Sequence, residues 1–163
     1  MSRKTAFDPA VDAETRLLIL GSLPGDASLA AGQYYAHPRN AFWRLVSEVT
    51  GRDLVTLSYD DRLTALKAAR IGLWDVVASA ERPGSLDAAI RRPEAADLRG
   101  LVARLPALRA VAFNGGTAAR LGRAALAGAT NVELIDLPSS SPAHARPFEL
   151  KAVAWRVLAL RLA

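Results

Sequence analysis

The chain has 163 residues, 51% of them hydrophobic, which is enough to bury one core and predicts a single domain over residues 1–163. It contains no cysteine and only two histidines, so disulfides, thiol catalysis and thiolate metal sites are excluded and no metal site is expected. A net charge of +5 favours an anionic partner such as nucleic acid, although an arginine-rich composition can equally reflect a GC-rich genome. No apolar stretch is long enough to span a membrane, and we expect a monomeric cytoplasmic protein.

Short apolar runs alternate with segments of helical spacing along the chain. In chain order, the predicted elements are an extended surface segment over 1–14, a strand over 16–20, helices over 41–50 and 60–69, a strand over 71–77, helices over 86–91 and 94–105, a strand over 110–113, a helix over 117–126, a strand over 131–137 and a helix over 148–162. Each connection between strands is long enough to return in the same direction, which predicts a three-layer α/β/α sandwich around a four-stranded parallel sheet.

Polar and small residues follow each predicted strand, in the segments 22–25, 75–79, 114–116 and 139–144. The carboxyl ends of parallel strands share one edge of a sheet, so these four segments are expected to form a single cleft. The cleft matches no common nucleotide-binding fingerprint, because neither G-x-G-x-x-G nor G-x-x-x-x-G-K-[ST] occurs. A serine hydrolase is also disfavoured, since G-x-S-x-G is absent and Ser139–Ser141 with His144 lack an acidic partner.

Three segments together resemble the uracil-DNA glycosylase superfamily, and within it the hypoxanthine-DNA glycosylases. They are G-S-L-P-G at 21–25, Q-Y-Y-A-H-P-R-N-A-F-W at 33–43 and P-S-S-S-P-A-H at 138–144. L-W-D-V-V at 73–77 and F-N-G at 113–115 extend the likeness over nearly the whole chain. The resemblance implies the same parallel sheet, no cofactor, and hydrolysis of the bond between a flipped base and its deoxyribose.

The resemblance also implies which residue acts on water. Uracil-specific relatives carry Asp or Asn at the position of Leu23, and an apolar side chain cannot orient water. The hypoxanthine branch ascribes this role to the asparagine of H-P-R-N, which is Asn40 here. Without the resemblance, Asn40 would be interpreted as the cap of the helix that begins at Ala41.

A base-binding pocket follows from the same comparison, with Ser22, Leu23, Pro24 and Gly25 shaping it through their backbone. Tyr35 is expected to stack on the flipped base, with Tyr34 as the alternative, while Phe42 and Trp43 are expected in the core. The remaining candidates are Asn114, which could bind a purine edge, and Ser141 with His144, which would face the anionic base.

Asp75 is an acid inside an apolar strand and is expected to face the cleft or to hold a loop through hydrogen bonds. Four cations are candidates for phosphate contacts, namely Arg39, Arg82, Arg146 and Lys151. Ala145 lies near the position of the wedge residue of relatives and is too small for that task, so Arg146 and His144 are the alternatives.

The predicted function is excision of hypoxanthine from DNA that contains deaminated bases. A uracil-DNA glycosylase, a catalytically silent nucleic-acid-binding domain and a hydrolase of small nucleotides remain the alternatives.

Overall fold

A four-stranded parallel sheet forms the centre of the computed structural model, which describes residues 3–129 and 131–163. Its strands, in the spatial order β3-β2-β6-β7, are β3 (Ile71–Asp75), β2 (Leu17–Gly21), β6 (Ala110–Asn114) and β7 (Glu133–Leu137). All three pairings are parallel. Every residue of β2 is buried, because the strand has a neighbour on each side and a layer on each face, which explains its continuous apolar run.

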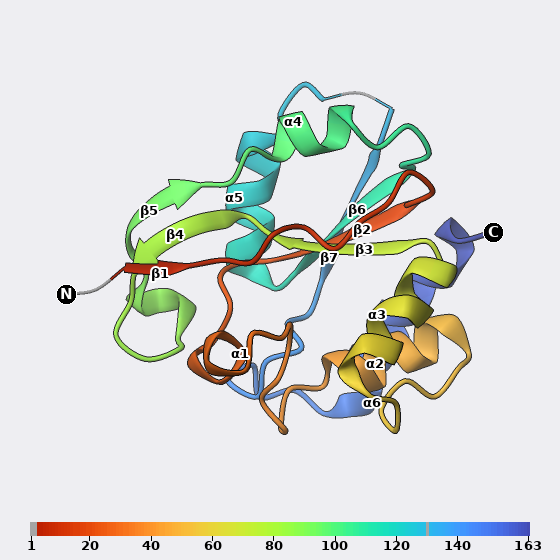
Figure 1. Cartoon of the computed structure of the whole chain (residues 1–163), viewed down its shortest axis with the longest axis horizontal. Coiled ribbons are helices and arrows are strands. Elements are labelled where there is room, and N and C mark those ends of the chain that lie inside the picture. The colour runs from red at the N-terminus through yellow and green to blue at the C-terminus, as the bar shows by residue number, and fades with distance from the viewer. Residues whose placement is uncertain (1–2, 130) are drawn as a thin grey trace.

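Helices cover both faces of this sheet (Figure 1). They are α1 (Asp26–Ala31), α2 (Phe42–Thr50), α3 (Tyr59–Ala68), α4 (Leu98–Ala103), α5 (Gly116–Ala125) and α6 (Phe148–Arg156), with the 3-10 helix η2 (Val157–Arg161) after α6. Leu17 and Ile19 of β2 pack in one core with α2, α3 and α6, while Leu18 and Leu20 pack in a second core with α4 and α5. The predicted three-layer arrangement is confirmed. None of the helices in the described ranges has the length and apolarity needed to cross a membrane.

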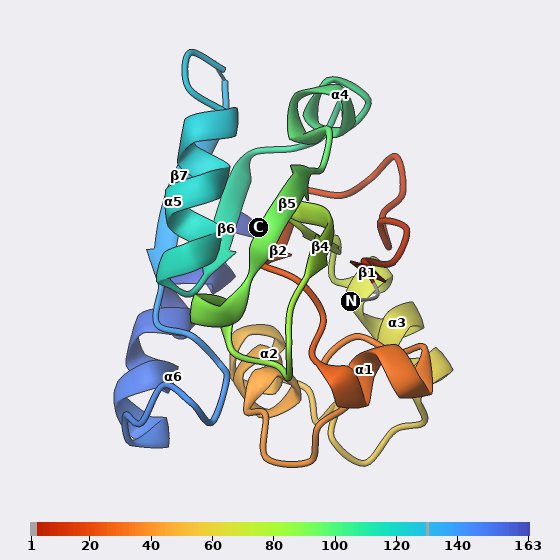
Figure 2. The same ribbon diagram turned by 90° about the vertical axis from the view of Figure 1, so that its left-hand side faces the viewer.

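A second, antiparallel sheet was not predicted. It consists of β1 (Arg3–Thr5), β4 (Val77–Glu81) and β5 (Arg91–Ala95) in the order β1-β4-β5 (Figure 2). The single strand predicted over 71–77 is therefore wrong, because the chain leaves the parallel sheet after Asp75 and continues as β4. Two backbone hydrogen bonds fix this departure, from Val76 N–H to the Gly21 carbonyl and from Val77 N–H to the Ser22 carbonyl.

The remaining differences lie at element ends and in short elements. The segment 1–14 is more than an exposed lead-in, because β1 pairs with β4, Ala10 bridges Leu73 and the Phe7 carbonyl accepts from Trp74 Nε1; residues 1–2 lie outside the described part. The helix predicted over 86–91 is only a 3-10 turn, η1 (Asp87–Ala89).

The helix predicted over 94–105 begins only at Leu98, where Asp97 caps it by accepting from Gly100 N–H. All five residues of β5 are exposed, so no apolar pattern marked that strand. Helix α1 is a single short turn after Gly25, and the final helix changes to a 3-10 helix after Arg156.

Candidate active site

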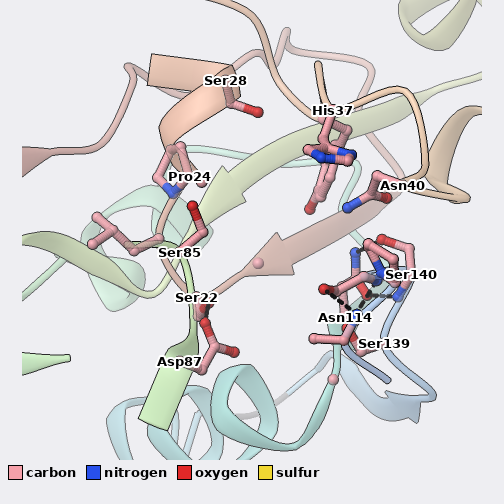
Figure 3. Close-up of a pocket in the computed structure, with 18 of the residues that line it drawn as sticks. Ser22, Pro24, Ser28, His37, Asn40, Ser85, Asp87, Asn114, Ser139 and Ser140 are labelled. Carbon is pink, nitrogen blue, oxygen red and sulfur yellow. Dashed lines mark hydrogen bonds between the residues drawn. The ribbon is translucent and has the colours of Figure 1, made fainter. Parts of the chain in front are cut away.

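A cavity of about 750 Å³ opens at the carboxyl edge of the parallel sheet. The carboxyl ends of all four parallel strands reach it, through Asp75 at the end of β3 and through the loops that follow β2, β6 and β7. Residues 76–79, which were also predicted in the cleft, do not line it, because the chain continues there into β4. Figure 3 shows Asn40 and His37 on one side and Ser22, Pro24, Ser85 and Asp87 on the other. The sequence-predicted residues that reach the cavity are Ser22, Leu23, Pro24, Gly25, Tyr35, Arg39, Asn40, Asn114, Ser141 and His144.

Asp75 and Tyr35 form the floor of the cavity around Gly21. Asp75 is 3% exposed, and a β-carbon on Gly21 would lie 2.7 Å from its Oδ1 and 2.9 Å from the Tyr35 hydroxyl. Within the residues that the structure describes, neither Asp75 Oδ2 nor the Tyr35 hydroxyl has a hydrogen-bond partner. The structure therefore places Asp75 at the cavity, and no hydrogen bond there supports the loop-holding alternative.

Both ionisable groups of the floor, Asp75 and Tyr35, have raised pKa values. The pKa of Asp75 is raised to about 7, mainly by burial and also by the nearby Asp87 carboxylate, while Arg82 opposes the shift. Burial also raises the pKa of the Tyr35 hydroxyl, with Asp75 acting in the same direction and Asn114 against it. Near neutral pH the Tyr35 hydroxyl is therefore protonated, and the Asp75 carboxyl is present in both its protonated and its ionised form.

Tyr35 is held in place by aromatic packing. Its ring stacks on Phe42 with centroids 3.9 Å apart, and its backbone has a φ of 55°, a value unusual for a residue with a side chain. Phe42 and Trp43 are buried in the core, which confirms that prediction. Tyr34 is 4% exposed and donates from its hydroxyl to the Asp8 carbonyl, so its ring is committed to the core and Tyr35 remains the candidate stacking residue.

Asn40 stands between the pocket and the start of α2. Its Oδ1 accepts from Phe42 N–H at 2.9 Å, and Ala41, not Asn40, occupies the N-cap position. Ala41 N–H in turn donates to the Ser140 carbonyl, which ties this segment to the loop after β7. One hydrogen bond thus orients the Asn40 amide, and its nitrogen and a second oxygen lone pair are left for other partners.

Asn114 at the end of β6 organises the loop after β7. Its Nδ2 donates to Ser140 Oγ at 2.9 Å, and its Oδ1 accepts from Ser140 N–H at 2.8 Å. The amide keeps one N–H and one lone pair with which it could bind a base edge. Ser141 is held nearby, because its N–H donates to Ser139 Oγ and its Oγ accepts from Ala143 N–H, whereas His144 is exposed at the rim.

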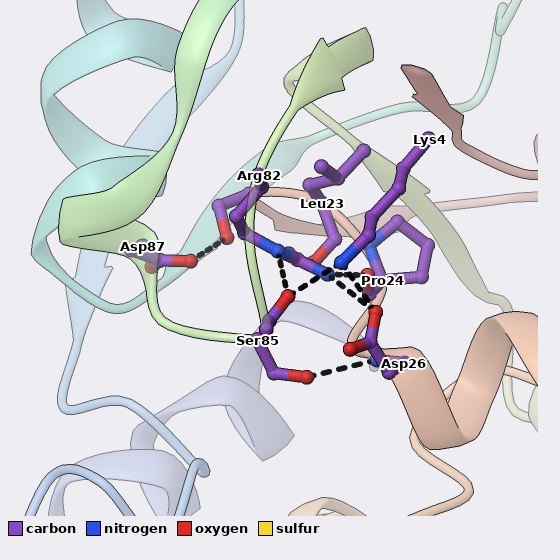
Figure 4. A network of polar contacts seen from close by, with 9 residues as sticks. Lys4, Leu23, Pro24, Asp26, Arg82, Ser85 and Asp87 are labelled. Carbon is purple, nitrogen blue, oxygen red and sulfur yellow. Dashed lines mark hydrogen bonds and ion pairs between the residues drawn. The ribbon is translucent and has the colours of Figure 1, made fainter. Parts of the chain in front are cut away.

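Arg82, a predicted phosphate contact, is 1% exposed, and its guanidinium is engaged within the protein. Its guanidinium donates to the carbonyls of Leu23, Pro24 and Gly84, and Asp26 lies 3.7 Å away (Figure 4). Arg82 therefore binds the backbone of the first pocket loop, residues 22–25, from inside the protein. Its cation is used to hold that loop in position.

Lys151, another predicted phosphate contact, is likewise 4% exposed, and its Nζ donates to the Ser141 carbonyl, which favours a role in holding the loop after β7. Arg39 is exposed at the cavity, and Arg146 is exposed outside its lining, so both stay predicted phosphate contacts.

Several pocket residues were missed from the sequence. Ser85, Leu86 and Asp87 reach the cavity from the β4–β5 connection, residues 82–90, and Asp87 accepts from Ser22 Oγ at 2.6 Å. No signal marked them, because that connection belongs to the unpredicted second sheet. Gly115 and Gly116 line the cavity as predicted, and Thr117 extends this lining at the start of α5, which brings the positive end of a helix dipole to the pocket. Across residues 3–129 and 131–163, no three acidic or histidine side chains cluster closely enough to hold a metal ion.

Comparison with known proteins places this pocket in a family. The model of the Uracil DNA glycosylase superfamily matches residues 9–159. A protein of Methanosarcina barkeri named Hypoxanthine DNA glycosylase is 40% identical over 153 residues, which are 94% of this chain and 96% of that protein. Its namesake from Methanosarcina acetivorans is 40% identical over 155 residues, 95% of this chain and 97% of that protein.

Structural comparison agrees with the sequence comparison. A solution NMR structure of a candidate uracil DNA glycosylase from Methanosarcina acetivorans superimposes with a TM-score of 0.88 at 40% identity. The match covers 99% of both chains. With the family model spanning nearly all of the fold and the pocket lying at its carboxyl edge, this chain belongs to the uracil DNA glycosylase superfamily.

Proposed function

We propose that this protein is a DNA glycosylase that removes hypoxanthine from DNA by hydrolysing its N-glycosidic bond. The observation that carries the proposal is the pocket itself, which gathers Asn40, Tyr35 and Asn114 in about 750 Å³ at one edge of the sheet. A cavity of that size accepts a purine with part of its sugar. The two relatives named for hypoxanthine, 40% identical over nearly the whole chain, support this choice of base.

The target nucleotide must leave the duplex to enter this pocket, because C1′ and the base edges are shielded in the stack. Tyr35 offers a ring that is stacked on Phe42, which gives a flipped base a rigid surface to lie against. The remaining donor and acceptor of Asn114 match the O6 and N1–H of hypoxanthine. Exposed Arg39 at the pocket is suited to contact phosphate.

Bond cleavage is a hydrolysis that needs no cofactor. Water adds its oxygen to C1′, the C1′–N9 bond breaks with its electron pair leaving on the base, and the proton lost by water ends on the released hypoxanthine. Asn40 is proposed to orient that water. Because an amide is not basic, its contribution is positioning, and the hydrogen bond to Phe42 N–H makes that position rigid.

Negative charge develops on the leaving base, and two features of the pocket are suited to it. The first turn of α5 directs the positive end of its dipole into the cavity through residues 115–117. His144 lies at the rim, near Ser141, and offers a second donor. Both are proposed to stabilise the departing anion.

Uracil is the second candidate base, favoured by the family description and by the matched NMR structure. Leu23 argues against it, since its side chain packs in the second core and offers no oxygen to a water molecule. The two functions separate in single-turnover base release from duplexes that contain deoxyinosine or deoxyuridine. Faster release of uracil would reverse the assignment, and release of neither base by folded protein would reject the proposal.

Two variants test Asn40. Asn40→Ala removes the amide together with the acceptor of Phe42 N–H, whereas Asn40→Ser keeps an oxygen for that backbone group. If Asn40 positions water, both variants lose base release by about a hundredfold or more and retain DNA binding, while only Asn40→Ala loses about 1 kcal/mol of stability. Recovery of release in Asn40→Ser would show that only the turn matters.

A further inference from the structure

One large apolar side chain stands exposed on the rim of the pocket. Leu86 is 60% exposed and lines the cavity. Six large hydrophobic residues are exposed in the described part of the chain, namely Val55, Leu86, Leu150, Val153, Val157 and Leu160. Of these six, Leu86 alone lies at the pocket. Single exposed leucines are common on protein surfaces, so the inference depends on the position of Leu86 at the pocket and on the hydrogen bonds that hold its neighbours.

The backbone around Leu86 is pinned on both sides (Figure 4). Before it, the Gly84 carbonyl accepts from Lys4 Nζ and Arg82 Nε, each at 2.7 Å, and Ser85 Oγ accepts from Asp26 N–H at 2.9 Å. After it, Asp87 accepts from Ser22 Oγ at 2.6 Å. The β4–β5 connection thus holds an exposed apolar side chain in place beside the first pocket loop.

Removing a base from a duplex leaves a gap in the stack, and proteins that open a stack insert an apolar side chain into it. On the side of the pocket that carries Ser139 and Ser140, the exposed residues of the loop after β7 include His144, Ala145 and Arg146. The methyl group of Ala145 is too small to fill such a gap, and His144 and Arg146 are polar rather than apolar. Ser85 and Asp87 lie on the opposite side in Figure 3, and Leu86 is between them in the chain.

We propose that Leu86 is the wedge that enters the duplex and occupies the space vacated by the flipped nucleotide. The inference rests on the proposed function, because it requires a duplex substrate whose base leaves the stack. It assigns DNA contact to the β4–β5 connection, and with it a role for the second sheet. The hydrogen bonds of Arg82, Ser85 and Asp87 then fix the segment that carries Leu86 before DNA binds, which reduces the entropy lost on binding.

The test compares wild type, Leu86→Ala and Leu160→Ala on deoxyinosine in duplex and in single-stranded DNA. Leu160 is 78% exposed and sits in η2, near the chain end that contacts Arg16 and Arg109 at the amino edge of the sheet, so it is a control for loss of an exposed leucine. A wedge acts only where a stack must be opened. Leu86→Ala is expected to slow base release from the duplex by about tenfold or more, the scale of one buried leucine side chain, and to leave the single strand within about twofold.

A second measurement reads base opening without cleavage. The fluorescence of 2-aminopurine next to the lesion rises when the stack opens, and Leu86→Ala should lose that rise while Leu160→Ala keeps it. A bulky aromatic nucleotide opposite the lesion should restore the duplex activity of Leu86→Ala, because it fills the gap itself. Equal losses on both substrates would show that Leu86 shapes the pocket, and no loss on either would also overturn the wedge. Absence of base release in wild type would instead reject the proposed function.

Discussion

The Asp75 carboxyl and the Tyr35 hydroxyl meet above the α-carbon of Gly21, at the floor of the pocket. A methyl group at that α-carbon would lie 2.7 Å from Asp75 Oδ1 and 2.9 Å from the Tyr35 hydroxyl. Both groups are therefore placed by one glycine on the central strand. Two consequences follow: the buried Asp75 carboxyl makes the stability depend on pH, and a side chain larger than that of glycine does not fit at residue 21 without a shift of its neighbours.

Asp75→Asn is expected to change how stability depends on pH. Burial raises the pKa of Asp75 from 3.8 to about 7, so between these values the native state binds more protons than the unfolded state. The free energy of unfolding of the wild type therefore falls as pH rises through that window, by up to about 4 kcal/mol from this group. The amide introduced by Asp75→Asn does not ionise, so the variant should match or trail wild type near pH 4 and exceed it at pH 8.

Urea unfolding of both proteins at several pH values checks this prediction. The difference between the two free energies isolates the carboxyl, because all other titrating groups are shared. Asp87 and Arg82 act on Asp75 in opposite directions and are unchanged in the variant. A difference that stays constant from pH 4 to pH 8 would contradict a raised pKa.

Gly21→Ala is expected to disturb the floor. The added methyl would come closer to the oxygens of Asp75 and Tyr35 than ordinary packing allows, and both side chains are held by a dense surrounding. We expect a loss of about 1–3 kcal/mol in stability and a fall in base release of at least tenfold at temperatures where the variant is folded. Gly116→Ala is the control for stability, because its methyl would meet no atom within 4 Å at the first position of α5. Unchanged activity of folded Gly21→Ala would show that the floor is adaptable.

Variants of Arg82 and Arg39 should distinguish an arginine that stabilises the fold from one that binds DNA. Arg82→Met leaves the carbonyls of Leu23 and Pro24 without their donor, removes one of the two donors of the Gly84 carbonyl, and should cost about 3 kcal/mol of stability. Arg39→Ala should leave stability unchanged and reduce the slope of log K against log salt for DNA binding by about 1. Thermal unfolding and salt titrations of binding measure both. A reduced slope in folded Arg82→Met would show that its cation reaches phosphate.

The sequence determined the parallel sheet and the pocket edge because both depend on local patterns. Buried strands such as β2 are continuous apolar runs, and the loops that follow parallel strands must meet. That rule brought Ser22, Asn114 and Ser141 to one cavity although they are far apart in the chain, whereas Tyr35 and Asn40 were predicted from the family resemblance.

Only the tertiary structure decided what each charged side chain does. A sequence does not distinguish an arginine that faces water from one such as Arg82, whose hydrogen bonds are to carbonyls brought together by folding. The second sheet could not be predicted from the sequence for a related reason. Its strands β1 and β5 are short and largely exposed, so no apolar pattern marks them. Their pairing with β4 is made by backbone hydrogen bonds, which any sequence can form. Leu86 lies at the pocket because it belongs to the connection between β4 and β5 of that sheet, so only the tertiary structure places it on the pocket rim.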